Sequence, residues 1–222
     1  MANTRLRFLA CSLAALLVIP VPSSAFETPL SDTAVREAYF LGQRHDETMA
    51  RLLEKYSKHL PVPKSGPYIA SVTFFTPFAQ LVMSSSEHSS GYSAQQAEID
   101  HRSQAESVRI VIDILFTDSY GPYIVRPTGS RPGSPTGFVP RPYDFWKDFQ
   151  VQLFDGDKPI RPFTSSGQPT LSCSDEGGCM LVGATIEFEF LAESLPADSV
   201  TVQVDPPEGD QVMVDFDLAS VR

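Results

Sequence analysis

Residues 184–190, ATIEFEF, alternate between apolar and acidic side chains. In a strand, Ile186, Phe188 and Phe190 would point to one face and the two glutamates between them to the other. Such alternation is typical of a β-strand that buries one face and exposes the other to water. Short alternating strands at intervals of about eight to twelve residues favour an antiparallel β-sandwich, immunoglobulin-like in general architecture. Three similar stretches flank this one: FQVQLF at 149–154, VTVQV at 200–204 and QVMVDFDL at 211–218.

Further strands are predicted earlier in the chain. YIASVTFF at 68–75 is rich in β-branched and aromatic residues, and SVRIVIDILF at 107–116 alternates over most of its length. FAQLVM at 78–83, just after Thr76-Pro77, predicts another strand. A polar insert, residues 84–104, separates these strands, and we expect a helix in its second half, from about residue 93.

Residues 31–60 carry the pattern of an amphipathic helix. Ser31 or Asp32 can cap its start, and the sequence LPVP at 60–63 ends it. Apolar side chains recur at spacings of three or four residues or their sums, and Gly42 leaves open whether one helix or two form here. We expect the apolar stripe to pack on the protein's own sheet.

Together these patterns predict an α+β protein that is mainly β, with an N-terminal amphipathic helix, or two, packed on an antiparallel immunoglobulin-like β-sandwich. The expected organisation is a helical segment at residues 26–66 and a β-sandwich domain at residues 67–222. This domain would contain a long loop rich in proline and glycine at residues 119–143, and such loops are either functional or mobile.

The first 25 residues predict a secretory signal peptide. Arg5 and Arg7 precede an apolar run from Phe8 to Val21, and small residues then lead to a cleavage point after Ala25. The run is shorter than the roughly 20 residues that span a bilayer. No later stretch is continuously apolar, so we expect no transmembrane segment after cleavage.

Charge and composition limit which cellular compartment and which classes of partner we expect. Two arginines leave with residues 1–25, so 17 basic residues become 15 against 27 acidic ones, and the net charge becomes −12. A chain this acidic is not expected to bind nucleic acid. The absence of asparagine after Asn3 and the scarcity of lysine resemble GC-rich codon usage. We therefore expect a secreted protein of a bacterial periplasm or exterior.

Two cysteines remain after cleavage, Cys173 and Cys179 in the stretch CSDEGGC. In an oxidising compartment, two cysteines at this spacing, with a strand on either side, predict a disulfide across the end of a hairpin. The chain-entropy argument assigns such a small ring roughly 2–2.5 kcal/mol. Structural zinc would require four ligands, and neither a CxxC zinc pair nor a CxxC redox pair is present.

Residues 120–149 contain the first candidate site. Arg126, Arg131 and Arg141 lie there with no acidic residue between Asp118 and Asp144. Arginines beside aromatic side chains would suit a sugar, a cell-wall polymer or an acidic peptide. Alternatively, the aromatic residues start a core strand and the arginines keep a loop soluble. The predicted ligand-binding residues are Arg126, Arg131, Arg141, Tyr143 and Trp146.

The second candidate lies in the polar insert at residues 84–104. Its His88, Glu98, Asp100 and His101 could hold a transition metal or divide acid and base roles. On a helix, however, Glu98 and His101 share a face that Asp100 does not, which favours an ordinary exposed helix.

The common catalytic and nucleotide-binding motifs are missing: the sequence has no GxSxG, SxxK, GxxxxGK, HExxH or GxGxxG. We therefore predict no cofactor and no catalytic residue. The favoured function is a secreted non-enzymatic binding or envelope-structural protein whose partner is an unknown protein or envelope polymer. The alternative is a metal-dependent or acid/base hydrolase centred on His88 and His101.

Overall fold

A computed structural model describes residues 26–222 except 89–90, 128, 130–133, 176 and 196–197. The predicted signal peptide, residues 1–25, lies outside the described residues. The described chain is mainly β, as predicted. Its α-helices are α1 (Asp32–Gly42), α2 (Glu47–Glu54), α3 (Pro77–Glu87) and α4 (Ala94–Arg102). Its strands are β1 (Ser57–His59), β2 (Tyr68–Phe75), β3 (Ser107–Leu115), β4 (Tyr123–Pro127), β5 (Thr136–Pro140), β6 (Gln150–Asp155), β7 (Lys158–Ile160), β8 (Thr164–Cys173), β9 (Cys179–Leu191), β10 (Ser199–Asp205) and β11 (Val212–Asp217).

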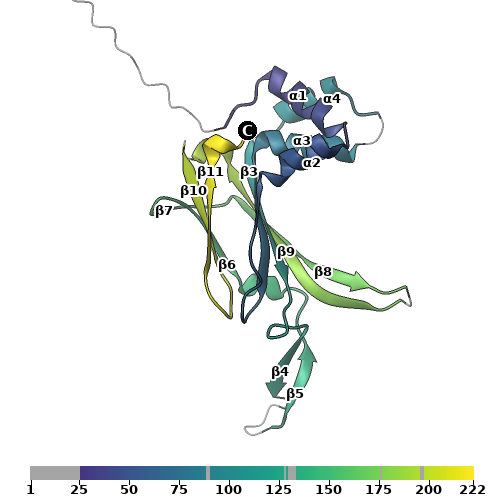
Figure 1. Ribbon diagram of the computed structural model, residues 1–222, viewed down its shortest axis with the longest axis vertical. Helices are drawn as coiled ribbons and strands as arrows, with labels where there is room; N and C mark the ends of the chain where they lie inside the picture. Colours follow the sequence, from purple (N-terminus) through teal and green to yellow (C-terminus); the bar gives the residue numbers. More distant parts are fainter. Residues whose placement is uncertain (1–25, 89–90, 128, 130–133, 176, 196–197) are drawn as a thin grey trace, which may run out of the picture.

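Two antiparallel sheets form the body of the protein (Figure 1). One has the strand order β1-β2-β3-β9-β8 and the other the order β11-β10-β6-β7. The two sheets share one hydrophobic core, to which the first contributes Ile112 and Ile186, for example, and the second Val202 and Phe216. A third, two-stranded sheet, β4-β5, projects from one end of this body.

The central strand β3 shows why the alternating pattern works. Ile110, Ile112 and Ile114 are almost fully buried in the shared core, while the residues between them lie on the other face. Both neighbouring strands pair with β3 over nearly its whole length, and Ile112 lies opposite Val72 of β2 and Ile186 of β9. The strand predicted at 107–116 is confirmed.

Residues 31–60 form two helices and the short strand β1. The Ser31 hydroxyl caps α1 by accepting from the Ala34 N–H, and the Asp46 carboxylate caps α2 by accepting from two backbone N–H groups. Between the helices, His45 has a left-handed backbone with φ 50°, so the chain turns there and starts a second helix.

The helices pack mainly on one another, beyond one end of the sheets (Figure 1). The buried face of α1, with Ala34 and Val35, lies against Phe78 and Val82 of α3 and Ala97 of α4. The expectation that the protein's own sheet covers this stripe is therefore wrong for α1.

The stretch 78–83 is helical, so the strand predicted there is wrong. Thr76 caps α3 with its hydroxyl, and Pro77 occupies the first turn, where a missing N–H costs nothing. Phe78, Leu81 and Val82 follow at helical spacing and meet α1. The Thr-Pro pair follows the end of β2 and starts a helix, so the apolar run after it is not a second strand. The helix predicted from about residue 93 is confirmed as α4.

The Cys173–Cys179 disulfide is present, with an S–S distance of 2.03 Å, and it joins directly opposed residues of β8 and β9. Among the described residues, no helix is both long enough and apolar enough to cross a bilayer.

Candidate functional site

The segment predicted as a long loop forms the β4–β5 hairpin for part of its length. Antiparallel pairing places Val125 opposite Phe138, with Tyr123 two residues along on the same face. These three side chains are 61%, 79% and 59% exposed. The hairpin projects away from both large sheets (Figure 1), and neither strand packs extensively on another helix or strand. Its apolar face is therefore open to solvent.

The hairpin segment is also basic, with three arginines between residues 119 and 143. Arg126 is exposed at the end of β4, opposite Gly137 of β5. Arg131 lies outside the described residues. Residues 119–143 include no acidic residue, so the hairpin is positively charged on a protein that is acidic overall, with Arg126 on the face of β4 opposite to that of Tyr123 and Val125.

Arg141 fastens the base of the hairpin. Its guanidinium lies over the Tyr120 ring, 3.6 Å from the centroid, and its Nε donates to the Gly121 carbonyl at 2.9 Å. The Tyr120 ring is buried, and burial raises the pKa of its hydroxyl to about 12. Phe116 and Phe145 lie about 6 Å from the same guanidinium. Arg141 thus joins the hairpin to an aromatic cluster of the core.

The aromatic platform predicted beside the arginines is not assembled. Phe145 and Phe149 are buried in the core, as the alternative interpretation expected, but Phe145 belongs to a short 3₁₀ helix, η1 (Phe145–Asp148), and not to a strand. The Trp146 ring lies directly on Gly167 of β8, where an added Cβ would come within 2.6 Å of it. Tyr143 is 62% exposed.

Sequence reasoning overlooked the side chains that make the hairpin distinctive, Tyr123, Val125 and Phe138. The signal was present, because YIVRP and TGFVP are two short runs rich in β-branched and aromatic residues. They flank a segment rich in glycine, proline and serine, which is the pattern of a hairpin.

A pocket of about 390 Å³ lies between α3, α4 and the start of β3. Three of the four residues proposed in the polar insert line it: His88, Asp100 and His101. Glu98 does not line it, because its carboxylate pairs with Arg36 of α1. The structure thus gathers the two histidines at one cavity, although they are distant in sequence.

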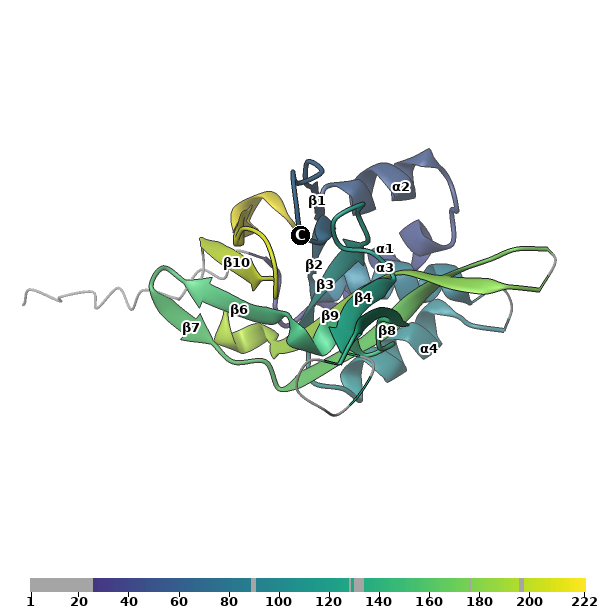
Figure 2. The ribbon, with the colours of Figure 1, turned by 90° about the horizontal axis from the view of Figure 1, so that it is seen from below.

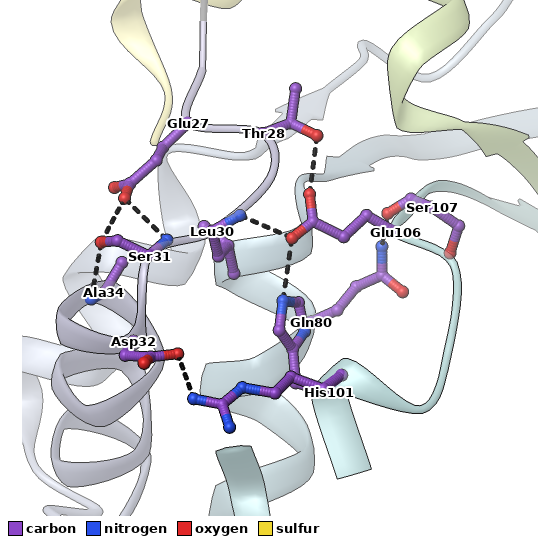
Figure 3. A network of polar contacts seen from close by, with 11 residues as sticks. Glu27, Thr28, Leu30, Ser31, Asp32, Ala34, Gln80, His101, Glu106 and Ser107 are labelled. Atoms are coloured by element: carbon purple, nitrogen blue, oxygen red, sulfur yellow. Dashed lines mark hydrogen bonds and ion pairs between the residues drawn. The ribbon is translucent and has the colours of Figure 1, made fainter. Parts of the chain in front are cut away.

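His101 is held by Glu106, the residue before β3 (Figure 3). The His101 Nε2 lies 2.8 Å from Glu106 Oε1, and the same carboxylate accepts from the Thr28 hydroxyl and the Leu30 N–H, each at 2.6 Å. Burial would raise the pKa of Glu106, but these hydrogen bonds outweigh burial and lower it. An ionised carboxylate only accepts, so Nε2 donates, and the neutral imidazole would carry its lone pair on Nδ1.

His88 is oriented by two contacts at the end of α3. Its Nδ1 lies 2.7 Å from the Ser84 carbonyl and donates to it, because a carbonyl oxygen only accepts. Its ring stacks on Tyr92 with the centroids 4.2 Å apart. Burial, and then the Asp100 carboxylate, raise the pKa of Tyr92. Among the residues that the structure describes, no three His, Cys, Asp or Glu side chains are grouped to hold a metal ion.

Comparison of the sequence with models of protein families and with curated proteins gave no match.

Proposed function

We propose that this protein is a secreted, non-enzymatic binding protein that docks a partner protein through the apolar face of the β4–β5 hairpin. The partner surface is apolar and bordered by carboxylates. An immunoglobulin-like arrangement of the two sheets, and export to a bacterial periplasm or exterior, belong to the same proposal. The disulfide supports export, because such bonds persist in oxidising compartments.

The main support for this proposal is that Tyr123, Val125 and Phe138 are exposed on one face of the hairpin. The hairpin packs extensively on no other helix or strand among the described residues. Contiguous exposed apolar side chains with a polar border are typical of protein-binding surfaces. A two-stranded hairpin alone is at best marginally stable in water. A partner that covers this face would bury the side chains and stabilise the hairpin at the same time.

Charge favours an acidic partner over a second copy that binds hairpin to hairpin. A symmetric pairing would bring the arginines of both hairpins together without an acidic residue between them. Carboxylates on a different surface would pair with Arg126 and speed the encounter. A protein is favoured over a polysaccharide because Gly167 covers part of the Trp146 ring, which leaves less of it for stacking on a sugar ring.

Photo-crosslinking in the secreting cells tests this function. A photoreactive phenylalanine analogue replaces Phe138, and a matched control places it at Leu171, which is 44% exposed on the β8–β9 hairpin. We expect a discrete adduct with a second protein from position 138 only, and its loss when Val125→Ser is added. Equal adducts from both positions, adducts only with another copy, or no adduct would contradict the proposal.

One observation favours an acid/base hydrolase as a second candidate function: His88 and His101 line the same pocket. In that function, His101 Nδ1 would act as the base, oriented by Glu106 at Nε2. Incubation with trialanine, followed by proton NMR, tests it. Cleavage that is lost in His101→Gln would support it, and intact trialanine would contradict this peptidase form of it.

A further inference from the structure

The pocket between α3, α4 and β3 has a charge polarity that the hairpin proposal does not use. Arg109 of β3 lines its sheet end together with Phe75 of β2. Glu87, at the end of α3, and Asp100 of α4 line the pocket as well, next to the stacked His88 and Tyr92 rings. The sheet end therefore holds Arg109 together with the Glu106 carboxylate, and the other end holds two further carboxylates.

Arg109 has hydrogen-bonding capacity to spare. Its side chain is 38% exposed, and among the described residues its ion pair is a single contact of 3.4 Å from Nη2 to Glu189. Its Nε is buried and has no hydrogen-bond partner among the described residues. Arginine presents several donors in a planar fork that matches a carboxylate. Because Nε is buried, a ligand carboxylate at the sheet end would meet the exposed Nη donors that Glu189 leaves unused.

The carboxylates of the pocket differ in availability. Glu106 already accepts three hydrogen bonds, two of them from the segment before α1. Its carboxylate is therefore not available to a ligand. Glu87 is exposed, and the Asp100 carboxylate accepts from Gln96 through Oδ1 and also lies against the Tyr92 hydroxyl. The exposed Glu87 carboxylate and the remaining lone pairs of Asp100 are therefore at the outer end, where a ligand ammonium group would find them.

The length of α3 sets the distance between the two ends. Gln80 donates to the Ser107 carbonyl at the sheet end, and Glu87 lies seven residues further along the same helix. At about 1.5 Å per residue, these positions are roughly 10 Å apart. An extended peptide advances about 3.3–3.6 Å per residue, so about three residues cover that distance.

We propose that this pocket binds a short extended peptide of about three residues with free termini. The peptide carboxylate pairs with Arg109, and the ammonium group lies between Glu87 and Asp100. Phe75 and the His88–Tyr92 pair contact the peptide side chains. A volume of about 390 Å³ is within the usual range of ligand pockets. A simple anion or cation would satisfy only one end, whereas a peptide with both charges satisfies both.

Isothermal titration calorimetry with trialanine tests the proposal on the full secreted protein. We expect trialanine to bind, and trialanine amide and N-acetyl-trialanine each to bind at least tenfold more weakly, because each lacks one charge. Dialanine should also bind at least tenfold more weakly, since it cannot reach both ends. Failure of trialanine to bind, or equal affinity for the amide, would overturn the proposal.

Two variants test the carboxylate contact and the ammonium contact of the peptide separately. In Arg109→Gln, the free and amidated peptides should bind with equal affinity, whereas in Asp100→Asn the acetylated peptide should lose at most a few-fold relative to the free one. Arg126→Gln, on the hairpin, should bind trialanine like the unaltered protein. If Arg109→Gln does not fold, Asp100→Asn still decides the matter at the other end. Because the hairpin is not involved, these results stand whatever the crosslinking shows.

Discussion

Two hairpins project from the same pair of sheets, and the protein supports them very differently (Figure 1). The β8–β9 hairpin continues the five-stranded sheet, because β9 pairs with β3 from Gly183 to Leu191. Figure 2 shows its end extending past the sheet, where the disulfide closes it. In the described part of the chain, β4 and β5 pair only with each other, and residues 119–143 contain no cysteine.

Their surfaces differ as much as their supports. The edge strand β8 is dominated by small polar residues, and Pro169 in its middle has no N–H for a further strand to use. The β4–β5 hairpin exposes Tyr123, Val125 and Phe138 instead. The β8–β9 hairpin is therefore stabilised by contacts within the chain. The β4–β5 hairpin is held at its base, and its apolar face is open to a partner.

Removing the disulfide should give the largest effect on the supported hairpin. The double substitution Cys173→Ser/Cys179→Ser should lower the free energy of unfolding by about 2–2.5 kcal/mol, because the unfolded chain regains the entropy of an open ring. Urea unfolding of the oxidised protein and the double variant measures the difference. A loss below about 0.5 kcal/mol would show that the clamp is unimportant.

The contact between Trp146 and β8 comes next in size. Gly167→Ala places a methyl group within 2.6 Å of the indole, and overpacking of this kind costs about 1–3 kcal/mol. Trp146 is the sole tryptophan, so a red shift of its emission should accompany the loss. Ser166→Ala, at an exposed neighbour, is the control. An unchanged spectrum in Gly167→Ala would rule out this contact.

At the base of the other hairpin, Arg141→Ala should lower the free energy of unfolding by about 1–2 kcal/mol. It removes the cation–π contact with Tyr120 and the hydrogen bond to Gly121. Arg126→Ala removes the same charge from an exposed position and should change the stability by less than about 0.5 kcal/mol. Equal losses in the two variants would mean that Arg141 does not fasten the hairpin.

The smallest effect on stability is expected at the exposed face of β4–β5. Phe138→Ser should change the free energy of unfolding by less than about 0.5 kcal/mol, since the ring is 79% exposed. The same change should reduce binding of the anionic apolar dye anilinonaphthalene sulfonate, measured by fluorescence. A loss above about 1 kcal/mol would show that the protein itself covers this ring.

The sequence predicted the features that depend on neighbouring residues alone. Alternation indicated which side chains of β3 and β9 share a face, and the cysteine spacing indicated that Cys173 and Cys179 lie opposite each other in a hairpin. Thr76-Pro77 ends strand β2, as predicted, but the short apolar run after it could form either a strand or a helix. The choice depends on α1, which buries Phe78 and Val82.

The sites depended more on tertiary structure. His88 and His101 meet at one pocket only because α3 and α4 both pack on α1. Arg109 looked like one polar residue of an alternating strand, and no local pattern indicated that a cavity would form beside it. The sequence identified the loop arginines as candidates. That Arg126 is exposed while Arg141 packs at the base of the hairpin depends on the position of the Tyr120 ring.

The most direct test of the central claim compares one exposed apolar side chain on each hairpin. The partner identified by crosslinking at position 138 is purified, and its dissociation constant is measured for the unaltered protein, Phe138→Ser and Leu171→Ser. Docking on β4–β5 predicts at least a thirtyfold weaker complex for Phe138→Ser, about 2 kcal/mol, and less than a twofold change for Leu171→Ser. Equal losses, or a larger loss at Leu171, would contradict the claim.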